Sequence, residues 1–598
     1  MQSLADLLAS LDDTPASYLR VARALPDVTS GVPLAVAVLS TFTFDTIAPY
    51  LSVELARRAF APTVWCAPFG QLEQVVLAND PAIAKAEVVV VAMRLEDTER
   101  ELIERFARLS PGETEERIAA TVTRLQALLA AVRERTTATI VVWNQAQPAA
   151  LASGFADASL ERSQAAAIGD LNTRIAKLAR SLPGVTVFDT ARVAAEVGLL
   201  AWNDAKLMHL ARVPFGTAAQ LRIGRVLSRV IAASRRAAAK CIVLDLDNTL
   251  WGGVLGEDGV GGLKLGEDFP GNAYKTFQRR LLAYRDRGIL LAIASKNNEA
   301  DVREMFASHG DLVLGWEDFA AHQVHWHDKA TSLRAIAKDL NIGLDALVFF
   351  DDNPLERAWV REQLPEVIVV EVPKDPLGYP TALDAVAELD QVTLTAEDRK
   401  RAELYQRESQ RRELETSTGS IDDFLRALEM RVTIGPIDAT TRERVCQLFG
   451  KTNQFNTTTR RHGAAELAAI ESAGGIGLWM RVEDKFGDHG LVGVAVAAPR
   501  GDGEFVVDSF LMSCRVLGRR VEQSLLAVLA ERVSARGART LLGEFIPTKK
   551  NAPAEGFFRD AGFELLEAGG PGDAPTWWKR DLVANPIPRP SLVHIEAS

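Results

Sequence analysis

Short apolar runs rich in β-branched residues alternate with helical patterns along the first part of the chain. Such runs occur at 33–45, 86–97, 138–148 and 184–190, with helix-like stretches such as 159–182 between them. Strands that helices cover on both faces have this continuous apolar character. The pattern predicts a doubly wound parallel sheet in the first domain.

The same alternation begins again after the Ala- and Arg-rich helical stretch 222–240. Strands are expected at 241–246, 289–294, 346–350 and 367–371, with helices between them. This pattern predicts a second α/β domain.

The C-terminal part has a different pattern. Alternating strands, such as 476–484 and 504–513, precede a long helix at 518–536, which predicts an α+β domain. We therefore divide the chain into domains 1–238, 239–394 and 419–584, with a charged helical connector at 395–418 and a flexible Pro-rich tail at 585–598.

Composition narrows the class of protein. The 598 residues, 47% of them hydrophobic and 25% charged, fit several soluble domains. Four cysteines without CxxC spacing argue against a disulfide framework and a zinc site, and they suit a reducing compartment. The net charge of −11 gives no reason to expect nucleic-acid binding, and no apolar run is long enough to span a membrane. We expect a cytoplasmic, multidomain enzyme.

Two carboxylates stand at the end of the first strand of the second domain. Asp245 and Asp247 face the same side if the chain stays extended through Leu246. Ligands of open α/β sheets bind beyond the carboxyl ends of the strands, and two acids placed there repel each other unless a cation or a proton lies between them. Taken alone, a strand-end Asp could instead cap the next helix.

Further polar residues follow the other strands of this domain. Ser295 ends the second strand, Lys329 begins a helix, and Asp351 and Asp352 end the third strand. Together with the first two acids, they predict an oxygen-rich Mg²⁺ site with hydroxyl and cationic contacts to a phosphate.

This order of motifs resembles the haloacid dehalogenase (HAD) phosphohydrolase superfamily. The resemblance implies that Asp245 attacks phosphorus and that Asp247 protonates the leaving oxygen and then activates water. It implies phosphate contacts from Ser295, Lys329, Asn248 and Thr249, and Mg²⁺ ligands from Asp245, Asp247, Asp351 and Asp352. The short intervals between motifs predict a capless, Rossmann-like HAD domain.

A narrower resemblance extends over the second and third domains. The segments "CIVLDLDNTLWGGVLGEDG", "FFDDNPLERAWVREQLPEV", "KTNQFNTTTRR" and "DKFGDHGLVGV" are similar to FkbH-like proteins of polyketide pathways. That resemblance implies transfer of a glyceryl unit from 1,3-bisphosphoglycerate, with dephosphorylation, to the phosphopantetheine thiol of an acyl carrier protein.

The third domain also resembles GNAT acyltransferases. In "CRVLGRR" (514–520), a loop between a strand and a helix is similar to the GNAT pyrophosphate loop, and amides at a helix start can bind phosphate. An arginine replaces the second glycine, which suits a phosphopantetheine arm. Candidate carrier-docking residues are Arg460, Arg461, Arg515, Gly518, Arg519 and Lys549.

Two further side chains could take part in transfer. Cys514, beside a basic residue and near a helix start, stands where a thiolate is favoured, and we expect it to relay the acyl group. A small, inert core residue is the alternative. His489 is a candidate general base, although a lone loop histidine is more often a surface or capping residue.

The first domain resembles SGNH hydrolases in a degenerate form. Ser40 ends the first strand, Asn144 follows a later one, and Asp204 and His209 are spaced too widely for the usual D-x-x-H. We expect a lid or a docking surface, and a working Ser40/Asn144/His209 esterase is the alternative.

These patterns favour a Mg²⁺-dependent glyceryl transferase and phosphatase that acts with a carrier protein. One alternative is a Mg²⁺-dependent HAD phosphatase of a small metabolite with non-catalytic flanking domains. Another is a carrier-protein adaptor, against which the intact acids, Ser295 and Lys329 argue.

Overall fold

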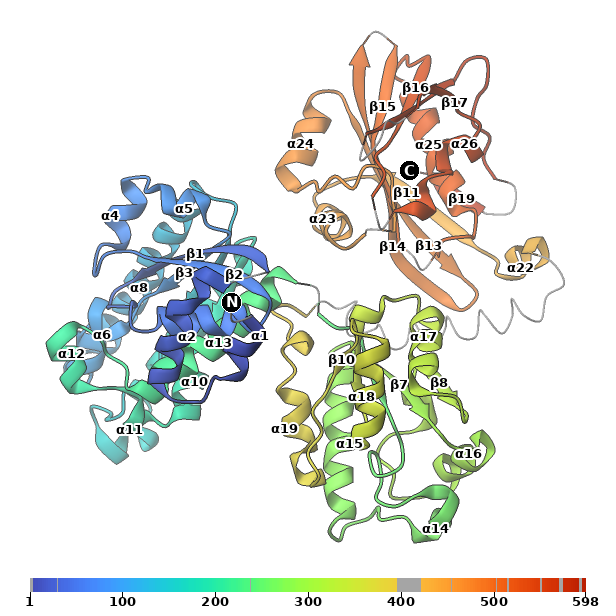
Figure 1. Cartoon of the computed structure of the whole chain (residues 1–598). Helices are drawn as coiled ribbons and strands as arrows, with labels where there is room; N and C mark the ends of the chain where they lie inside the picture. Colours follow the sequence, from blue (N-terminus) through green and yellow to red (C-terminus); the bar gives the residue numbers. More distant parts are fainter. Residues whose placement is uncertain are drawn as a thin grey trace. The chain divides into compact units, whose positions relative to one another are not determined.

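The structure is a computed structural model, and three β-sheets organise it (Figure 1). It describes residues 4–28, 31–236, 238–394, 421–452, 454–501, 503–513, 516–548, 551–568, 574–590 and 594–597. The predicted connector 395–418 lies outside these residues. The chain divides into two compact units, Met1–Lys240 with Val370–Thr395, and Cys241–Val369 with Ala396–Ser598.

The first sheet is fully parallel, with the strand order β2-β1-β3-β4-β5. Its strands are β1 (Val32–Ser40), β2 (Phe60–Cys66), β3 (Val88–Ala92), β4 (Thr139–Trp143) and β5 (Val185–Phe188). Because side chains alternate along a strand, Val36 and Val38 of β1 join one apolar core and Ala37 and Leu39 join another. Both faces are therefore buried, which explains the continuous apolar runs.

Helices cover both faces of this sheet. One core includes side chains of α3 (Ala48–Ala56), α10 (Thr190–Val197) and α13 (Thr217–Arg235), and the other includes side chains of α8 (Pro111–Arg133) and α9 (Gln164–Ser181). The remaining helices of this part are α1 (Leu4–Ala9), α2 (Pro15–Val28), α4 (Leu72–Leu77), α5 (Pro81–Lys85), α6 (Leu95–Thr98), α7 (Glu101–Glu104), α11 (Leu199–Trp202) and α12 (Ala205–Ala211).

The first unit also includes a later segment of the chain, Val370–Thr395. It contains α19 (Tyr379–Asp384), and the guanidinium of Arg229 in α13 binds both carboxylate oxygens of Asp390, at 2.6 and 2.9 Å. The backbone N–H of Ala239 also donates to the carbonyl of Glu388.

The second sheet is also fully parallel, in the order β10-β9-β6-β7-β8. Its strands are β6 (Cys241–Leu244), β7 (Leu290–Ser295), β8 (Ala321–Val324), β9 (Leu347–Phe350) and β10 (Ile368–Val369). Its helices are α14 (Leu255–Gly262), α15 (Gly271–Asp286), α16 (Glu299–Ser308), α17 (Lys329–Asp339) and α18 (Pro354–Gln363). The stretch 241–369 is described throughout, and it holds no inserted sheet between β6 and β7, as predicted.

The third sheet is mixed, and most of its strand pairs are antiparallel. Its strands are β11 (Arg431–Pro436), β12 (Phe455–Asn456), β13 (Ile476–Asp484), β14 (Gly487–Gly501), β15 (Glu504–Met512), β16 (Thr540–Phe545), β17 (Glu564–Glu567), β18 (Thr576–Asp581) and β19 (His594–Ala597). The long helix α25 (Val521–Ser534) packs on one face, while α23 (Arg442–Lys451) and α24 (Ala464–Ser472) pack on the other. Two short helices, α22 (Ile421–Ala427) and α26 (Phe557–Asp560), also lie among the described residues of this part.

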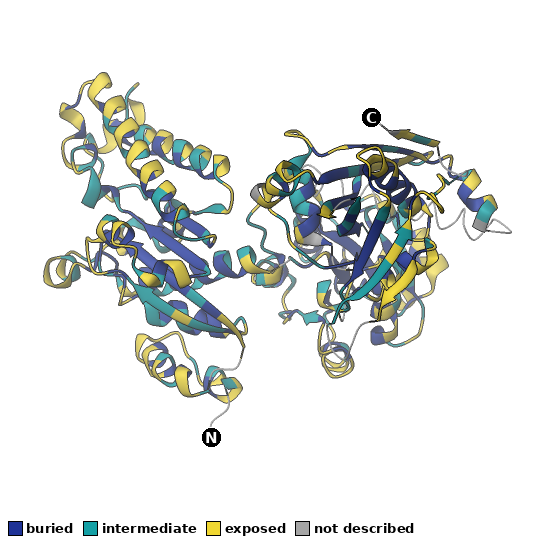
Figure 2. Cartoon of the chain, turned by 90° about the horizontal axis from the view of Figure 1, so that it is seen from above, coloured by how far each residue is buried: buried dark blue, intermediate teal, exposed yellow. Residues whose placement is uncertain are grey.

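Burial follows these layers. Figure 2 shows buried residues along the strands and exposed residues on the outer sides of the helices. The multidomain α/β fold with a C-terminal α+β part is confirmed. Among the described helices, none is both long enough and apolar enough to cross a membrane.

Candidate active site

The register of the second sheet brings two acids together. Leu244 of β6 lies opposite Phe350 of β9, so the next residues, Asp245 and Asp351, leave the sheet side by side. The backbone N–H of Asp245 donates to the carbonyl of Phe350 at 3.1 Å, which extends the ladder to the first acid.

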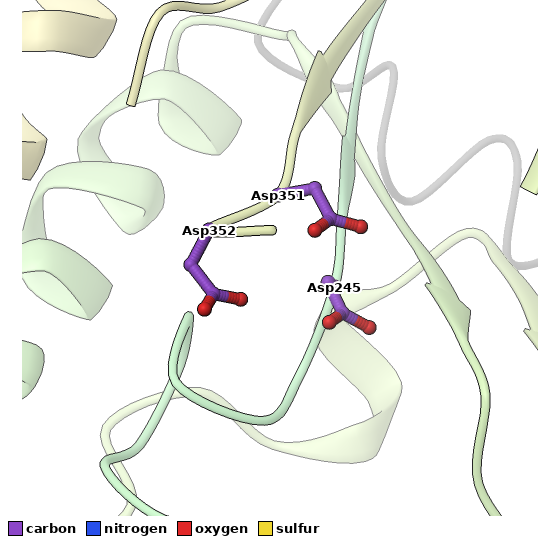
Figure 3. A group of neighbouring side chains, drawn as sticks. All are labelled: Asp245, Asp351 and Asp352. Atoms are coloured by element: carbon purple, nitrogen blue, oxygen red, sulfur yellow. The ribbon is translucent and has the colours of Figure 1, made fainter. Parts of the chain in front are cut away.

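Asp352 joins these two acids. One ligand oxygen from each of Asp245, Asp351 and Asp352 lies within 4.8 Å of the others (Figure 3). The hydroxyl of Thr249 donates to a carboxylate oxygen of Asp352 at 3.4 Å, and the backbone N–H of Asp352 lies 3.3 Å from that hydroxyl. Thr249 therefore ties the loop after β6 to the loop after β9.

Lys329 is the cation of this group. Its buried Nζ donates to Oδ1 of Asp245 and to the carbonyl of Ala294, each at 2.6 Å, and it lies 3.0 Å from Oδ2 of Asp351. Burial alone would lower the pKa of Lys329, but the charges of Asp245 and Asp351 raise it above its ordinary value. The lysine is therefore protonated and pairs with both acids.

The group has more negative than positive charge. Burial, together with the charge of Asp245, raises the pKa of Asp351 to about 7 and the pKa of Asp352 to about 6. Oδ2 of Asp351 is fully buried and accepts no hydrogen bond of good geometry, although Lys329 lies within ion-pair distance. Three carboxylates with one lysine fit a divalent cation, because oxygen ligands and an excess of negative charge are what such ions require.

Asp247 lies outside this group of three. Its Oδ1 accepts hydrogen bonds from the indole N–H of Trp251 at 2.9 Å and the backbone N–H of Leu255 at 3.0 Å. Its Oδ2 accepts from the side-chain amide of Asn297 at 2.8 Å. These three donors fix the orientation of the carboxylate, as acid–base chemistry on a bound substrate requires.

Asn297 is a site residue that the sequence reasoning missed. Its amide also donates to the hydroxyl of Ser295 at 3.3 Å, so one buried side chain connects the end of β7 to Asp247. The sequence feature that could have identified Asn297 is its position two residues after Ser295, in the segment "SKNN" (295–298).

Asn248 has a local role in this structure. Its φ of 53° is left-handed, and its side-chain oxygen accepts a hydrogen bond from the backbone N–H of Gly253 at 2.9 Å. This bond closes the loop that follows Asp247. A phosphate contact from Asn248 stays a prediction.

His489 is buried in the third sheet rather than open to a substrate. Its Nε2 lies 2.9 Å from Oδ2 of Asp484 and 3.1 Å from Nη1 of Arg519, and all three side chains are at most 7% exposed. The arrangement joins the β13–β14 hairpin to the residues just before α25. It fits a structural role better than that of a general base.

Two predicted docking arginines also form internal bonds. Arg460 pairs with Asp508 at 3.2 Å and with Glu544 at 2.9 Å, and Arg461 donates to the carbonyls of Phe449 and Thr452. Like Arg519, they do not offer unpaired positive charge. Gly518 has a φ of +78°, where glycine is favoured, and a side chain there would meet open space.

Three predicted residues, Cys514, Arg515 and Lys549, lie outside the described residues. Of the other three cysteines, only Cys241 is buried, while Cys66 and Cys446 are partly exposed. Cys241 is fully buried in β6, and burial raises the pKa of Cys66 to about 12.

The SGNH-like residues of the first domain bond to their surroundings. The buried hydroxyl of Ser40 donates to the carbonyl of Phe42 at 2.6 Å, and the amide of Asn144 donates to Asp189 at 2.8 Å. His209 is exposed on α12. None of the hydrogen bonds of Ser40 among the described residues reaches a histidine, and the SGNH-like assignment of this part stays a prediction.

Comparison with known proteins supports the phosphatase-type fold. No family model and no curated protein matches the sequence. Among solved structures, the chain is similar to the N-terminal part of the protein BF1531 from Bacteroides fragilis, which contains a phosphatase domain and is complexed with Mg. The two are 25% identical, the match covers 66% of this chain and 100% of that chain, and the TM-score is 0.53. Because 66% is much more than residues 241–369, the likeness includes more than the second sheet.

Two further solved structures each match about a quarter of the chain. A GNAT-family protein from Desulfovibrio desulfuricans is 20% identical over 25% of this chain and 99% of its own, with a TM-score of 0.22. The aminoglycoside 6′-acetyltransferase type Ii is 19% identical over 26% of this chain and 99% of its own, with a TM-score of 0.20. These scores are too low to assign a fold, and the α+β description above depends on the third sheet itself.

Proposed function

We propose that this protein is a Mg²⁺-dependent phosphatase and acyltransferase in which Asp245 is the nucleophile. The observation that carries this proposal is the grouping of Asp245, Asp351 and Asp352 around one buried lysine at the carboxyl edge of a parallel sheet. A solved structure that is similar to this chain contains a phosphatase domain and is complexed with Mg. Mg²⁺, held by the three carboxylates, would neutralise charge that otherwise keeps an anionic nucleophile away from phosphate.

Each side chain of this site has its own role in the proposed reaction. A carboxylate oxygen of Asp245 bonds to phosphorus as the bond to the leaving oxygen breaks, and Asp247 supplies a proton to that oxygen. Asp247 then takes a proton from the water that hydrolyses the aspartyl-phosphate. Lys329, Ser295 and Thr249 contact the phosphoryl oxygens. Asp247 as a further metal ligand stays a prediction, because its three donors hold it apart from the other acids.

The more specific proposal is transfer of a glyceryl unit from 1,3-bisphosphoglycerate to the phosphopantetheine thiol of an acyl carrier protein, as in polyketide precursor synthesis. It rests on the resemblance of the sequence to FkbH-like proteins, with the C-terminal domain as the acyltransferase and carrier-docking part. Residues 1–238 and 239–394 would then form the SGNH-like and HAD-like domains, and 419–584 the GNAT-like domain.

A second candidate function is a Mg²⁺-dependent phosphatase of a small metabolite with non-catalytic flanking domains. It is favoured by the internal bonds of Arg460, Arg461 and Arg519, which leave fewer free cations to attract an acidic carrier protein.

One experiment separates the two functions. The full chain is incubated with Mg²⁺, 1,3-bisphosphoglycerate and a pantetheinylated carrier protein, and both free phosphate and the mass of the carrier are measured. We expect phosphate release and a carrier that gains one glyceryl group, with both lost in Asp245→Asn if the phosphatase site acts in transfer. Phosphate release without a mass gain supports the small-metabolite phosphatase.

A further inference from the structure

One loop of the second sheet is held at both ends by residues of the candidate active site. The backbone N–H of His325, the residue after β8, donates to the carbonyl of Ser295 at 3.1 Å. Four positions later, the side chain of Lys329 reaches Asp245. We call the segment that leads up to this lysine, residues 325–328, the β8 loop.

A lysine lies next to the start of the β8 loop. Ser295 of β7 lies opposite Val324 of β8, so Lys296 and His325 are the first residues beyond these two strands. Lys296 pairs with Glu356 of α18 at 2.5 Å, and 38% of its side chain remains exposed. The ammonium group is therefore accessible to a ligand at this edge of the sheet.

The ring of His325 shapes the β8 loop. The side-chain amide of Gln323 donates to Asp339 at 3.1 Å, so its oxygen faces His325 and accepts from Nε2 at 3.0 Å. Nδ1 of His325 accepts from the backbone N–H of His327 at 3.3 Å. Burial, and then the charge of His327, lower the pKa of His325, which agrees with this neutral form. Both ring nitrogens of His325 are thus used inside the protein.

The ring of His327 is open to solvent. His327 is exposed, and its ring lies against that of His325, with 4.5 Å between the two centroids. Among the described residues, no hydrogen bond reaches either ring nitrogen of His327. Asp328, the next residue, instead accepts from Thr331 and from the indole N–H of Trp359 at 3.3 Å. An ordered loop therefore leaves one imidazole free beside the phosphatase site.

The spacing of the strands suits a ligand with two phosphates. Lys329 is committed to the first phosphate position, because it pairs with Asp245 and Asp351. Neighbouring parallel strands lie about 4.8 Å apart, so β8 is about 10 Å from β6 across β7. An extended three-carbon chain with a phosphate at each end spans a similar length. Donors for the second phosphate are thus needed near the end of β8, where Lys296 and His327 lie.

We propose that His327 and Lys296 bind the second phosphate of the substrate while its first phosphate lies at Asp245. This inference rests on the phosphatase proposed above, and it names the residues that make that site selective for a substrate with two phosphates. The imidazole of His327 donates a hydrogen bond to a phosphate oxygen, and Lys296 exchanges its bond with Glu356 for one with the phosphate.

Two acyl phosphates separate this role from the chemistry at Asp245. Both 1,3-bisphosphoglycerate and acetyl phosphate carry an acyl phosphate, but only the first has a second phosphate. Phosphate release by the full chain with Mg²⁺ is measured for each. We expect His327→Gln to raise KM for 1,3-bisphosphoglycerate about 10-fold or more, the range of a hydrogen bond to a charged group, with kcat unchanged. KM for acetyl phosphate should stay the same, and Lys296→Gln should show the same selective loss.

A control and two contradicting results make this test decisive. His594→Gln changes an exposed histidine of the third sheet and should keep both KM values. A His327→Gln or Lys296→Gln enzyme with the wild-type KM for 1,3-bisphosphoglycerate would overturn the proposal. So would an equal rise of KM for both acyl phosphates, because that result places the effect at the first phosphate.

A binding measurement distinguishes this proposal from the proposed function. With Mg²⁺, 3-phosphoglycerate should shift the NMR signal of the His327 imidazole, and glycerate, which lacks the phosphate, should not. The signal is assigned by its loss in His327→Gln. If the wild-type chain releases phosphate from neither acyl phosphate, the phosphatase proposed above is wrong. The NMR signal then decides the matter for His327: a shift supports the second-phosphate site, and an unmoved signal overturns it.

Discussion

Asp245 and Asp351 occupy the first positions beyond two strand residues, Leu244 and Phe350, that lie opposite each other in register. The sheet itself therefore holds the two carboxylates together, and Lys329 pairs with both, at 2.6 and 3.0 Å. A change to this lysine should therefore alter the proposed phosphatase reaction.

Replacing Lys329 tests this pairing. Lys329→Met keeps the bulk of the side chain but leaves the acids without their protein cation, so phosphate release should fall about 100-fold or more. Lys338→Met, on the exposed side of the same helix, is the matched control and should keep wild-type activity. A Lys329→Met enzyme with normal phosphate release would contradict the assignment.

The pH dependence of cation binding follows from the raised pKa values, about 7 for Asp351 and about 6 for Asp352. Between the ordinary Asp value of ~3.9 and these values, the folded metal-free protein binds more protons than the unfolded chain, so this contribution to stability falls as pH rises. A divalent cation needs the ionised carboxylates. The rise in Tm caused by Mg²⁺ should therefore be small near pH ~5.5 and full near pH ~8.

Thermal unfolding with and without Mg²⁺ at both pH values measures this effect. Asp351→Asn should reduce the Mg²⁺-induced rise at both. An equal rise at the two pH values for the wild type would show that these acids do not bind the ion.

Asn297 should act through Asp247 rather than through the metal. Asn297→Ala removes the donor to Oδ2 of Asp247, so the carboxylate loses its fixed orientation, and the turnover rate should fall by up to about 100-fold. The Mg²⁺-induced change in Tm should stay the same, because Asp245, Asp351 and Asp352 are unaffected. Asn298→Ala, at the exposed next position, is the control.

The buried group around His489 should matter for stability. Asp484→Ala leaves Arg519 without its buried carboxylate and should cost about 3–5 kcal/mol in the free energy of unfolding. Asp488→Ala removes a half-exposed pair with Arg481 from the same hairpin and should cost less than about 1 kcal/mol. Chemical denaturation of both variants gives the comparison, and similar costs would show that the buried group is not an anchor.

The sequence predicts the second sheet and most of its candidate site because the polar residues of the site lie at the ends of strands or at the start of a helix. Asp245, Lys329, Asp351 and Asp352 each stand at the end of an apolar run or at the start of a helix, and parallel strands bring such positions to one edge. The strand pattern does not predict the surroundings of Asp247. Its three hydrogen-bond donors are Trp251 and Leu255, which follow it closely in the chain, and Asn297, fifty positions away.

The ion-pair partners of the C-terminal arginines also could not be predicted from the sequence. Arg460 is part of a basic cluster in the sequence, but its partners, Asp508 and Glu544, come from two strands far along the chain. Alternation of apolar residues predicts such strands, but it does not show that the pairing of β15 with β16 ends at Val507 and Gly543 or that Asp508 is the extra residue of a bulge.

The most direct test of the account is phosphorylation of Asp245. The full chain is mixed with 1,3-bisphosphoglycerate and Mg²⁺, quenched in acid and examined by mass spectrometry for a phosphoryl group and its position. We predict one phosphoryl group on Asp245, formed only with Mg²⁺ and missing in Asp245→Asn. A wild-type enzyme that turns over phosphate while Asp245 never carries it, or an Asp245→Asn variant with full activity, would contradict the account.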